Sequence, residues 1–352
     1  MNIKITGSGS YIPNVVTKNA DFDKHEFYNI DGSSFPHDNE TTIRKFKAIT
    51  GIEERRYMDK ELNTSDIAVI AAQEAIANAG IDAETLDYII VAHNYGDVKS
   101  NTVQSDTVPS LATRVKAKLK IQNPRCVGYD LLFGCPGWIE GMIQANAFIK
   151  AGLAKKCLII GAEALSRVVD QHDRDSMIFS DGAGAVILEA KDEQGGILAH
   201  ETATHSYQES EYIYFGKSNH AEKPEDIKYI KMHGRKIYEF ALVNVPNAMK
   251  SCLENSGRSI NDLKTIFIHQ ANAKMDHAII NRFYKLHDMT PPEHVMPMTI
   301  HELGNSSVAT VPTLFDLVNK DKIADQKLQK GDVIMFASVG AGMNINAITY
   351  EV

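Results

Sequence analysis

The sequence predicts an α/β protein built from two similar halves. Strand-like apolar runs alternate with helix-length periodic segments along its 352 residues, a pattern typical of α/β architecture. The segment ANAGIDAETLDYIIVA at 77–92 resembles ENSGRSINDLKTIFIH at 254–269, displaced by 177 residues. A second pair, LIIGAE at 158–163 and IMFASV at 334–339, is displaced by 176, which is half the chain length. Two matches at nearly one displacement indicate a duplicated chain whose halves pack against each other.

A chain of this length exceeds one typical domain, which also favours two units. We place an N-terminal half at 1–180 and a C-terminal half at 181–352. Similar helix–loop–strand units also arise in α/β proteins without duplication, and that alternative stays open at this point.

Short apolar runs predict six strands, at 87–92, 157–162, 184–189, 264–269, 332–338 and 345–350. Periodic segments predict five helices, at 64–79, 136–151, 235–256, 271–286 and 308–319. Residues 19–45 are polar with Gly and Pro and predict a long surface loop or cap, while 205–232 form an excursion that joins the halves. Long excursions on a rigid α/β body often build binding sites.

Composition excludes several functional classes. The net charge is −8, from 37 Lys and Arg against 45 Asp and Glu, without a basic block, which argues against a nucleic-acid partner. The start MNIKITGSGSYIP lacks the apolar core of a signal peptide and no apolar run approaches 18 residues, so we expect a cytoplasmic protein that does not enter the membrane. The four cysteines are scattered as free thiols, and no histidine has a helical ligand spacing, so we expect neither a metal nor another cofactor.

The stretch GYDLLFGCPGWIEG at 128–141 places Cys135 on the hinge between an expected strand and an expected helix. With Pro136 at the first helical position, the thiol would lie at a helix N-terminus, where unpaired N–H groups and the dipole lower the pKa of a cysteine. The flanking glycines permit a tight turn and close approach of a substrate. A buried cysteine that behaves as a small hydrophobe is the alternative, and it suits the other three cysteines better. We therefore interpret Cys135 as a nucleophile.

Two further segments could supply its partners. IFIHQANAK places His269 at the end of an expected strand, where ligands usually bind in α/β sheets, although a single histidine is more often structural. HELGNSSVATVP places Asn305 in a turn just before an expected helix. ASVGAGMN is a Gly-rich turn between two expected strands, which could supply a backbone N–H donor.

Taken together and in this order, these segments resemble the β-ketoacyl-acyl-carrier-protein synthase III family of the thiolase superfamily. The resemblance covers nearly the whole chain and rests on six short motifs, GSGSYIPNVVTKN, TGIEERRY, CPGWIEGMIQANAFIKAG, DRDSMIFSDGAGAVIL, HQAN and GNSS. It implies a thiolase-like duplicated fold, with two similar halves packed as a layered αβαβα body.

The resemblance also implies a mechanism. Cys135 would take an acyl group from a thioester, and His269 and Asn305 would donate hydrogen bonds to the thioester carbonyl of a malonyl-type extender. Decarboxylation of the extender would give a carbanion that attacks the acyl group on Cys135. The backbone N–H groups of Cys135 and Ala341 would form the oxyanion hole, and the histidine would have to be neutral. Phe179 would line the substrate tunnel, and Val108 would lie at the acyl tunnel of the partner subunit.

The implied partners are acyl carrier protein and acyl thioesters, with acyl-CoA as a further possibility, and the implied assembly is a homodimer. An acidic carrier would require cations near the tunnel mouth, and Lys274, Arg282 and Lys285 on one expected helix could supply them. An ordinary solvated helix face is the alternative for these three residues.

Departures from the family pattern concern the substrate. Lys45 and Ile49 stand where members primed by acetyl-CoA usually carry a Trp and an Arg, and Val108 stands where many carry a large aromatic residue. We therefore expect a primer that is longer than acetyl-CoA or bound to a carrier, and a roomier tunnel.

Several other functions are compatible with the fold or the residue types. Relatives could join two acyl-derived chains into a dialkylresorcinol or cyclohexanedione precursor, or transfer an acyl group without decarboxylation. An inactive partner subunit of a heterodimer would have no chemical need for Cys135, His269 and Asn305 together. A degradative thiolase needs a cysteine after Cys252, a hydroxymethylglutaryl-CoA synthase needs a glutamate in the segment AHNYGD, and the sequence has neither. A papain-like hydrolase would require a different architecture.

Overall fold

The computed structural model describes residues 2–352 and contains two large sheets with the same strand arrangement. The first has the order β1 (Asn2–Tyr11), β9 (Asp181–Lys191), β8 (Lys156–Ala164), β4 (Tyr88–Ala92) and β7 (Val127–Leu131). The second has the order β10 (Gly196–Thr204), β15 (Asn344–Glu351), β14 (Val333–Gly340) and β13 (Leu263–Ile268). In each sheet the first three strands pair antiparallel and the following strands pair parallel.

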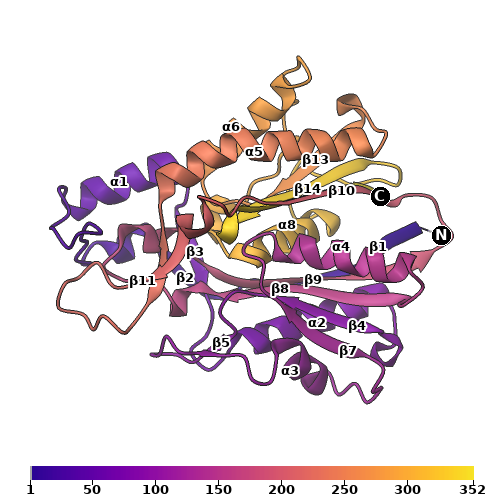
Figure 1. The fold of residues 1–352 in the computed structure, drawn as a ribbon, viewed down its shortest axis with the longest axis horizontal. Coiled ribbons are helices and arrows are strands. Elements are labelled where there is room, and N and C mark those ends of the chain that lie inside the picture. The colour runs from indigo at the N-terminus through magenta and orange to yellow at the C-terminus, as the bar shows by residue number, and fades with distance from the viewer. Residues whose placement is uncertain (1) are drawn as a thin grey trace.

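Helices separate and cover the two sheets in five layers (Figure 1). Helices α4 (Gly137–Lys150) and α8 (Thr310–Asn319) lie between the sheets. Helices α2 (Thr64–Ala79) and α3 (Leu111–Lys118) cover the outer face of the first sheet, and α5 (Gly234–Asn255) and α6 (Ala273–Lys285) cover that of the second. The predicted αβαβα layering is confirmed.

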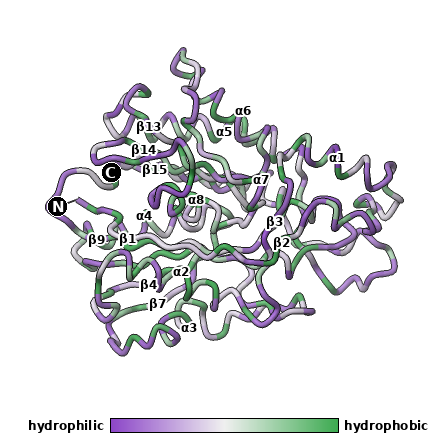
Figure 2. Tube along the Cα trace, turned by 180° about the vertical axis from the view of Figure 1, so that it is seen from behind, coloured by the Kyte–Doolittle hydropathy of each residue, from purple (hydrophilic) through white to green (hydrophobic). Residues whose placement is uncertain are grey.

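The two inner helices are apolar on most of their faces because sheets pack on both sides of them. Trp138 and Phe315 are 1% and 4% exposed and belong to one core cluster with Phe336 of β14. The rings of Trp138 and Phe336 meet edge to face with centroids 5.6 Å apart. In Figure 2, hydrophilic stretches gather in the outer loops, while hydrophobic residues follow the strands and the helices packed on them.

All six predicted strands and all five predicted helices occur, with ends displaced by at most three residues. The strands β1 and β10 and the helices α1 (Asn39–Thr50) and α3 were not expected. Strand β1 reads NIKITGSGSY, whose glycines and hydroxyl residues weaken the alternation that predicts a strand. The loop expected over 19–45 is wrong for residues 39–45, because Asp38 caps α1 by accepting a 2.7 Å hydrogen bond from the backbone N–H of Thr41.

The chain passes from the first sheet to the second between Lys191 and Gly196. The division into halves at 180 stays a prediction. The excursion at 205–232 follows β10 of the second sheet, so the expectation that it joins the halves is wrong for the two sheets; it folds back as the hairpin β11 (Ile213–Gly216) and β12 (Tyr229–Met232). The shorter elements are β2 (Val15–Lys18), β3 (Glu54–Tyr57), β5 (Asp97–Val98), β6 (Ser105–Asp106) and α7 (Ile300–Leu303). Within residues 2–352, each helix is too short or too polar to cross a membrane.

A buried ion-pair cluster fastens the hairpin to the body. Lys231 of β12 is 3% exposed, and its Nζ lies 2.6 Å from Asp170 and 3.0 Å from Asp173. The side chain of Asn219 accepts a third hydrogen bond from the same Nζ at 2.8 Å. Separating a buried ammonium group from its acceptors would leave buried charges without partners, which costs several kcal/mol. The cluster therefore holds the hairpin in one position.

Helix α6 contains a buried carboxyl group that yields a stability prediction. Asp276 is fully buried, and neither of its side-chain oxygens has a partner with good hydrogen-bond geometry among the described residues. Burial raises its pKa well above the usual range, and the nearby backbone N–H groups of Asn272 and Ala271 oppose this shift only in part. The folded state therefore keeps a proton that the unfolded chain releases above about pH 4, so this group costs stability increasingly as pH rises. We expect Asp276→Asn to stabilise the protein at pH 8 by about 1–3 kcal/mol and to have a smaller effect near pH 4.

Thermal unfolding followed by circular dichroism at both pH values measures the difference. Asp316 provides the matched control, because this buried carboxylate lies 2.7 Å from Lys320 Nζ and accepts a 2.7 Å hydrogen bond from Ser10. Asp316→Asn is expected to lower the melting temperature. An Asp276→Asn variant less stable than the parent at pH 8 would contradict the prediction.

Candidate active site

Cys135 lies in a short turn between β7 and α4, at the edge of the inner helix layer. Gly134 has a φ of +66°, a left-handed conformation that residues with a side chain rarely adopt. Pro136 is the N-cap and α4 begins at Gly137, one residue later than the sequence predicts. Cys135 therefore lies two residues before the start of the helix, one residue farther than expected.

The turn that carries Cys135 meets a second turn, Gly340–Ala341, which follows β14. A Cβ on Gly340 would overlap the backbone nitrogen of Cys135, and a Cβ on Gly134 would lie 2.7 Å from the backbone nitrogen of Ala341. Because glycine has no Cβ, the two backbones can approach this closely. The two N–H groups expected to form an oxyanion hole thus belong to adjoining turns, and both residues line one cavity.

The electrostatics of Cys135 differ from the expectation. Burial raises the pKa of the Cys135 thiol to about 11. The Ser307 hydroxyl donates a hydrogen bond to Sγ over 3.4 Å, which lowers this pKa but by less than burial raises it. The charge of Glu163 raises this pKa further. The lowered pKa expected from the helix N-terminus is therefore wrong for the free thiol, because burial has the largest effect on it.

His269 directly follows β13 and is 4% exposed. Its backbone N–H donates to the carbonyl of Ala337 over 2.9 Å, and its Nδ1 has no hydrogen-bond partner among the described residues. Burial lowers the pKa of the imidazole to about 4, so the ring is neutral near pH 7. A neutral ring can donate one hydrogen bond and accept another, which is the form that the expected chemistry requires.

Asn305 is held by the backbone of the segment before β9. Its N–H donates to Ile178 over 3.0 Å, and its carbonyl accepts from Ser180 over 2.8 Å. The side-chain Oδ1 accepts a 2.8 Å hydrogen bond from the N–H of Ser307. The donating NH₂ group of Asn305 thus stays available to a ligand, since its oxygen is already engaged.

The structure brings the three predicted residues together. Cys135, His269 and Asn305 line one cavity of about 90 Å³. Phe179 and Ala341 line the same cavity. Its other apolar walls come from the hairpin, from the start of α5 and from neighbouring turns, namely Ile213, Ile230, Met232, Ile237, Leu165 and Met343.

A wider cleft of about 650 Å³ adjoins this cavity. Met232, Ile237, Ala271, Met275 and Asn305 line both, so the cleft leads to the buried site. The segment 29–37 and helix α1 form one side of the cleft, in keeping with the binding role expected for the cap.

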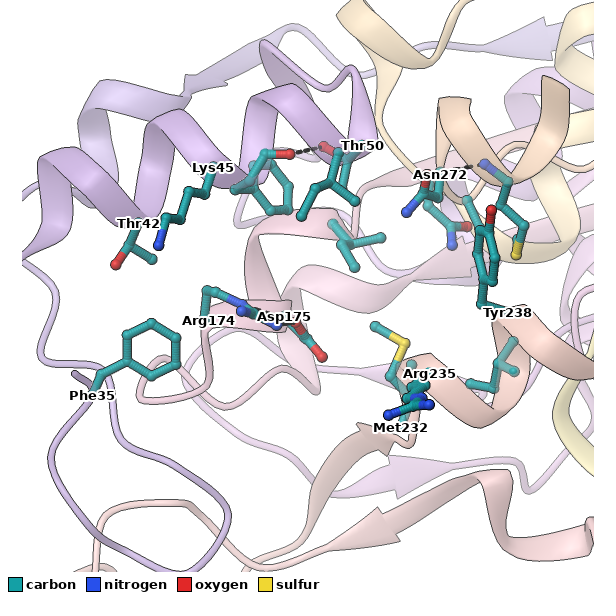
Figure 3. A pocket seen from close by; sticks show the side chains of 18 of the residues that line it. Phe35, Thr42, Lys45, Thr50, Arg174, Asp175, Met232, Arg235, Tyr238 and Asn272 are labelled. Carbon is teal, nitrogen blue, oxygen red and sulfur yellow. Dashed lines mark hydrogen bonds and ion pairs between the residues drawn. The ribbon is translucent and has the colours of Figure 1, made fainter. Parts of the chain in front are cut away.

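Cationic side chains gather at the cleft (Figure 3). Lys45 extends from α1, and its Nζ lies 2.8 Å from His37 Nε2. The Arg174 guanidinium lies 5.4 Å from the centroid of the Phe35 ring and 2.8 Å from Asp175. Arg235 also lines the cleft.

The other predicted residues lie on the surface. Lys274, Arg282 and Lys285 are exposed on α6, and none of the three forms an ion pair within residues 2–352. Lys274 lies between Asn272 and Met275, both of which line the cleft. Val108 is 84% exposed and does not line the cavity of its own chain, so its role in a partner's tunnel stays a prediction.

Sequence reasoning missed two groups of residues that shape the site. Asn94 and Ser307 line the cavity beside Cys135, and only the short motifs AHNYGD and GNSS hint at them. Arg55, in the motif TGIEERRY, is fully buried and donates to the carbonyl of Met177 over 2.8 and 3.0 Å. It thereby fixes the backbone two residues before Phe179.

Comparison with known proteins identifies the family. The family model for the N-terminal part of 3-oxoacyl-[acyl-carrier-protein] synthase III matches residues 129–206, and the model for its C-terminal part matches residues 253–352. A relative from Vibrio vulnificus, β-ketoacyl-[acyl-carrier-protein] synthase III 1, is 34% identical over 344 residues, which cover 97% of each chain. A relative from Paracoccus denitrificans with the name β-ketoacyl-[acyl-carrier-protein] synthase III is 31% identical and covers 96% of each chain.

The chain belongs to the β-ketoacyl-[acyl-carrier-protein] synthase III family. Solved structures of the same family agree with this assignment. The Aquifex aeolicus enzyme is 28% identical and superposes with a TM-score of 0.80 over 99% of this chain and 100% of that one. The Thermus thermophilus enzyme is 28% identical and superposes with a TM-score of 0.81 over 99% of both. The predicted thiolase-like fold and the assignment as an acyltransferase of this family are confirmed.

The buried imidazole yields a direct prediction. In an NMR titration with ¹³C-labelled histidine, the ring signals of His269 are expected to stay those of neutral imidazole from pH 8 down to about pH 5. Burial is the cause, because it disfavours the charged form of the ring. The signal that disappears in His269→Asn provides the assignment. A midpoint near the ordinary value of about 6.5 would contradict the burial argument.

Proposed function

We propose that this protein is a ketosynthase that forms a carbon–carbon bond by decarboxylative Claisen condensation, with Cys135 as the acyl carrier. The observation that carries the proposal is the meeting of Cys135, His269 and Asn305 on one buried cavity. Membership of the synthase III family supports the same reaction class.

In the first half-reaction, the sulfur of Cys135 attacks the carbonyl of an acyl thioester. A new S–C bond forms on Cys135, the S–C bond of the donor breaks, and the proton of Cys135 ends on the departing thiol. The N–H groups of Cys135 and Ala341 donate to the oxyanion of the tetrahedral intermediate. The adjoining turns that carry them support this role.

In the second half-reaction, a malonyl-type thioester loses CO₂ and becomes an enolate. The neutral ring of His269 and the NH₂ group of Asn305 donate hydrogen bonds to the enolate oxygen. The enolate carbon attacks the acyl group on Cys135, the C–C bond forms and the thiolate leaves. A cysteine hydrolase instead uses a thiolate activated by an imidazolium, whereas burial here favours two neutral groups.

We further propose a primer other than acetyl-CoA. Lys45 and Ile49, the two departures from the acetyl-CoA-primed pattern, both line the entrance cleft. The apolar walls of the inner cavity suit an aliphatic acyl chain. Acyl carrier protein is the proposed donor, because the exposed cations of α6 begin beside the cleft. A cytoplasmic location agrees with the four free cysteines.

Acyl transfer can be tested by intact-protein mass spectrometry. The protein is incubated with a panel of thioesters that differ in chain length, each offered on CoA and on acyl carrier protein. We expect the mass of one acyl group on the parent protein, highest with a primer longer than acetyl, and none on Cys135→Ala because the nucleophile is gone.

Asn305→Ala separates the two half-reactions. We expect it to be acylated like the parent but to lose condensation by about 100-fold or more, because one enolate donor is missing. Labelling that persists in Cys135→Ala would contradict the proposed nucleophile. Fastest acylation by acetyl-CoA would contradict only the primer.

We also propose a homodimer joined along β7. This strand ends the first sheet, so one of its edges has no partner strand within residues 2–352. Val127 at its start and Leu132 directly after its end are 47% and 65% exposed. An unpaired edge with apolar ends is a surface that a second copy can cover.

Light scattering coupled to size exclusion is expected to give twice the monomer mass of 39.0 kDa. Leu132→Asp is expected to shift the peak toward the monomer, because a charge would be buried in the interface. Leu153 is also 65% exposed, so Leu153→Asp is the matched control. A monomeric parent protein at micromolar concentration would contradict the dimer.

A further inference from the structure

A chain of hydrogen bonds leads from the sulfur of Cys135 to a buried carboxyl group. The Ser307 hydroxyl donates to Cys135 Sγ over 3.4 Å and accepts from Asn94 Nδ2 over 3.1 Å. The same NH₂ group of Asn94 donates to Glu163 Oε2 over 2.5 Å. The backbone N–H of Asn94 donates to Glu163 over 3.1 Å as well. Ser307 lies between α7 and α8. Asn94 follows β4, and Glu163 belongs to β8.

The acceptors in this chain determine its direction. Glu163 accepts both bonds from Asn94, so the side chain of Asn94 presents its NH₂ group and not its oxygen. Since the hydroxyl oxygen of Ser307 accepts a hydrogen bond from this NH₂ group, its own proton is free to point at the sulfur of Cys135. A donor aimed at sulfur stabilises the thiolate more than the thiol and so opposes the effect of burial on the pKa.

The backbone of Ser307 points to the same conclusion. Ser307 has a φ of +53°, in the left-handed region that a residue with a Cβ seldom occupies. Its N–H donates to the side chain of Asn305 over 2.8 Å. One strained turn thus orients both the NH₂ group of Asn305 and the hydroxyl of Ser307, and such strain gathers at functional sites.

The chain cannot carry the proton of Cys135 to Glu163. The amide of Asn94 stands between them, and an amide NH₂ group does not accept a proton at ordinary pH. Burial raises the pKa of Glu163 to about 7, and the titratable groups that face it are His93, Tyr95 and Cys135. A nearby negative charge would hinder thiolate formation, so Glu163 contributes its hydrogen bonds and not its charge.

We propose that Ser307 is a catalytic residue whose hydroxyl donates a hydrogen bond to the reacting sulfur, and that Asn94 and Glu163 are positioning residues that orient this hydroxyl. The role rests on the proposed function of Cys135 as nucleophile. It acts on the ionisation of the thiol, before any substrate is bound.

Alkylation by iodoacetamide tests the proposal without any thioester. The rate of modification of Cys135 is followed between pH 6 and 10 by peptide mass spectrometry, which separates it from the other cysteines. Because the pKa of the parent thiol is raised to about 11, the rate rises throughout this range, and a change of the midpoint is measured as a displacement of this rising limb along the pH axis. Ser307→Ala is expected to shift the midpoint of the profile up by about one pH unit and to slow alkylation at pH 7 about tenfold. Ser307→Gly, which accepts the positive φ without strain, is expected to give the same shift and covers the case in which the alanine variant folds poorly.

Two further variants separate orientation from charge. Glu163→Gln keeps an oxygen that accepts from Asn94, so it is expected to leave the midpoint unchanged or lower it. Glu163→Leu removes the same charge and also the acceptor, so its midpoint is expected to lie above that of Glu163→Gln, and Asn94→Ala is expected to raise the midpoint above that of the parent. Ser306→Ala is the control, because the Ser306 hydroxyl lies 3.4 Å from Thr310 and is not bonded to Cys135.

Profiles of Ser307→Ala and Ser307→Gly that coincide with that of Ser306→Ala would overturn the role of Ser307. Equal midpoints in Glu163→Gln and Glu163→Leu would overturn the positioning role. If alkylation responds as expected while no thioester labels the parent protein, the proposed ketosynthase function fails together with the catalytic role of Ser307, and only its hydrogen bond to the sulfur of Cys135 stands.

Discussion

Two backbone turns from different sheets meet beside Cys135 at a distance that leaves no room for a side chain between them. Gly134 and Gly340 are the residues that permit this contact, because a Cβ on either would meet the backbone of the other turn. Because of this contact, Cys135 and Ala341, whose N–H groups are the proposed oxyanion donors, line one cavity. It also locates that cavity at the junction of the two sheets, where His269 enters from the end of β13 and Asn305 from the turn after α7.

Burial at this junction determines the charges of the site. The same removal from water raises the pKa of the Cys135 thiol and lowers the pKa of the His269 imidazole, so both are neutral near pH 7. Polarity is supplied instead by fixed donors, which are the backbone N–H groups, the NH₂ group of Asn305 and the hydroxyl of Ser307. Donors fixed in a dry site stabilise developing negative charge without the cost of reorienting water.

Segments outside the duplicated sheets form the access route. The cap residues 29–37 and helix α1 line the entrance cleft, and the hairpin β11–β12 supplies walls of the inner cavity. The buried contacts of Lys231 with Asp170 and Asp173 hold the hairpin against the body. Under the proposed function, substrate selection would depend on these excursions, while the sheets that position Cys135 and His269 could stay the same.

The sequence by itself determined the duplicated α/β fold, because strand and helix patterns are local and recur at one displacement in the chain. It also indicated Cys135, His269 and Asn305, which stand in short motifs at the ends of predicted elements. Only the tertiary structure decided the protonation states and the link from Ser307 through Asn94 to Glu163, since burial and hydrogen bonding join residues up to 213 positions apart. The lowered thiol pKa predicted from a helix N-terminus was wrong for this reason: the local dipole is visible in the sequence, whereas the larger effect of desolvation depends on what packs around the sulfur.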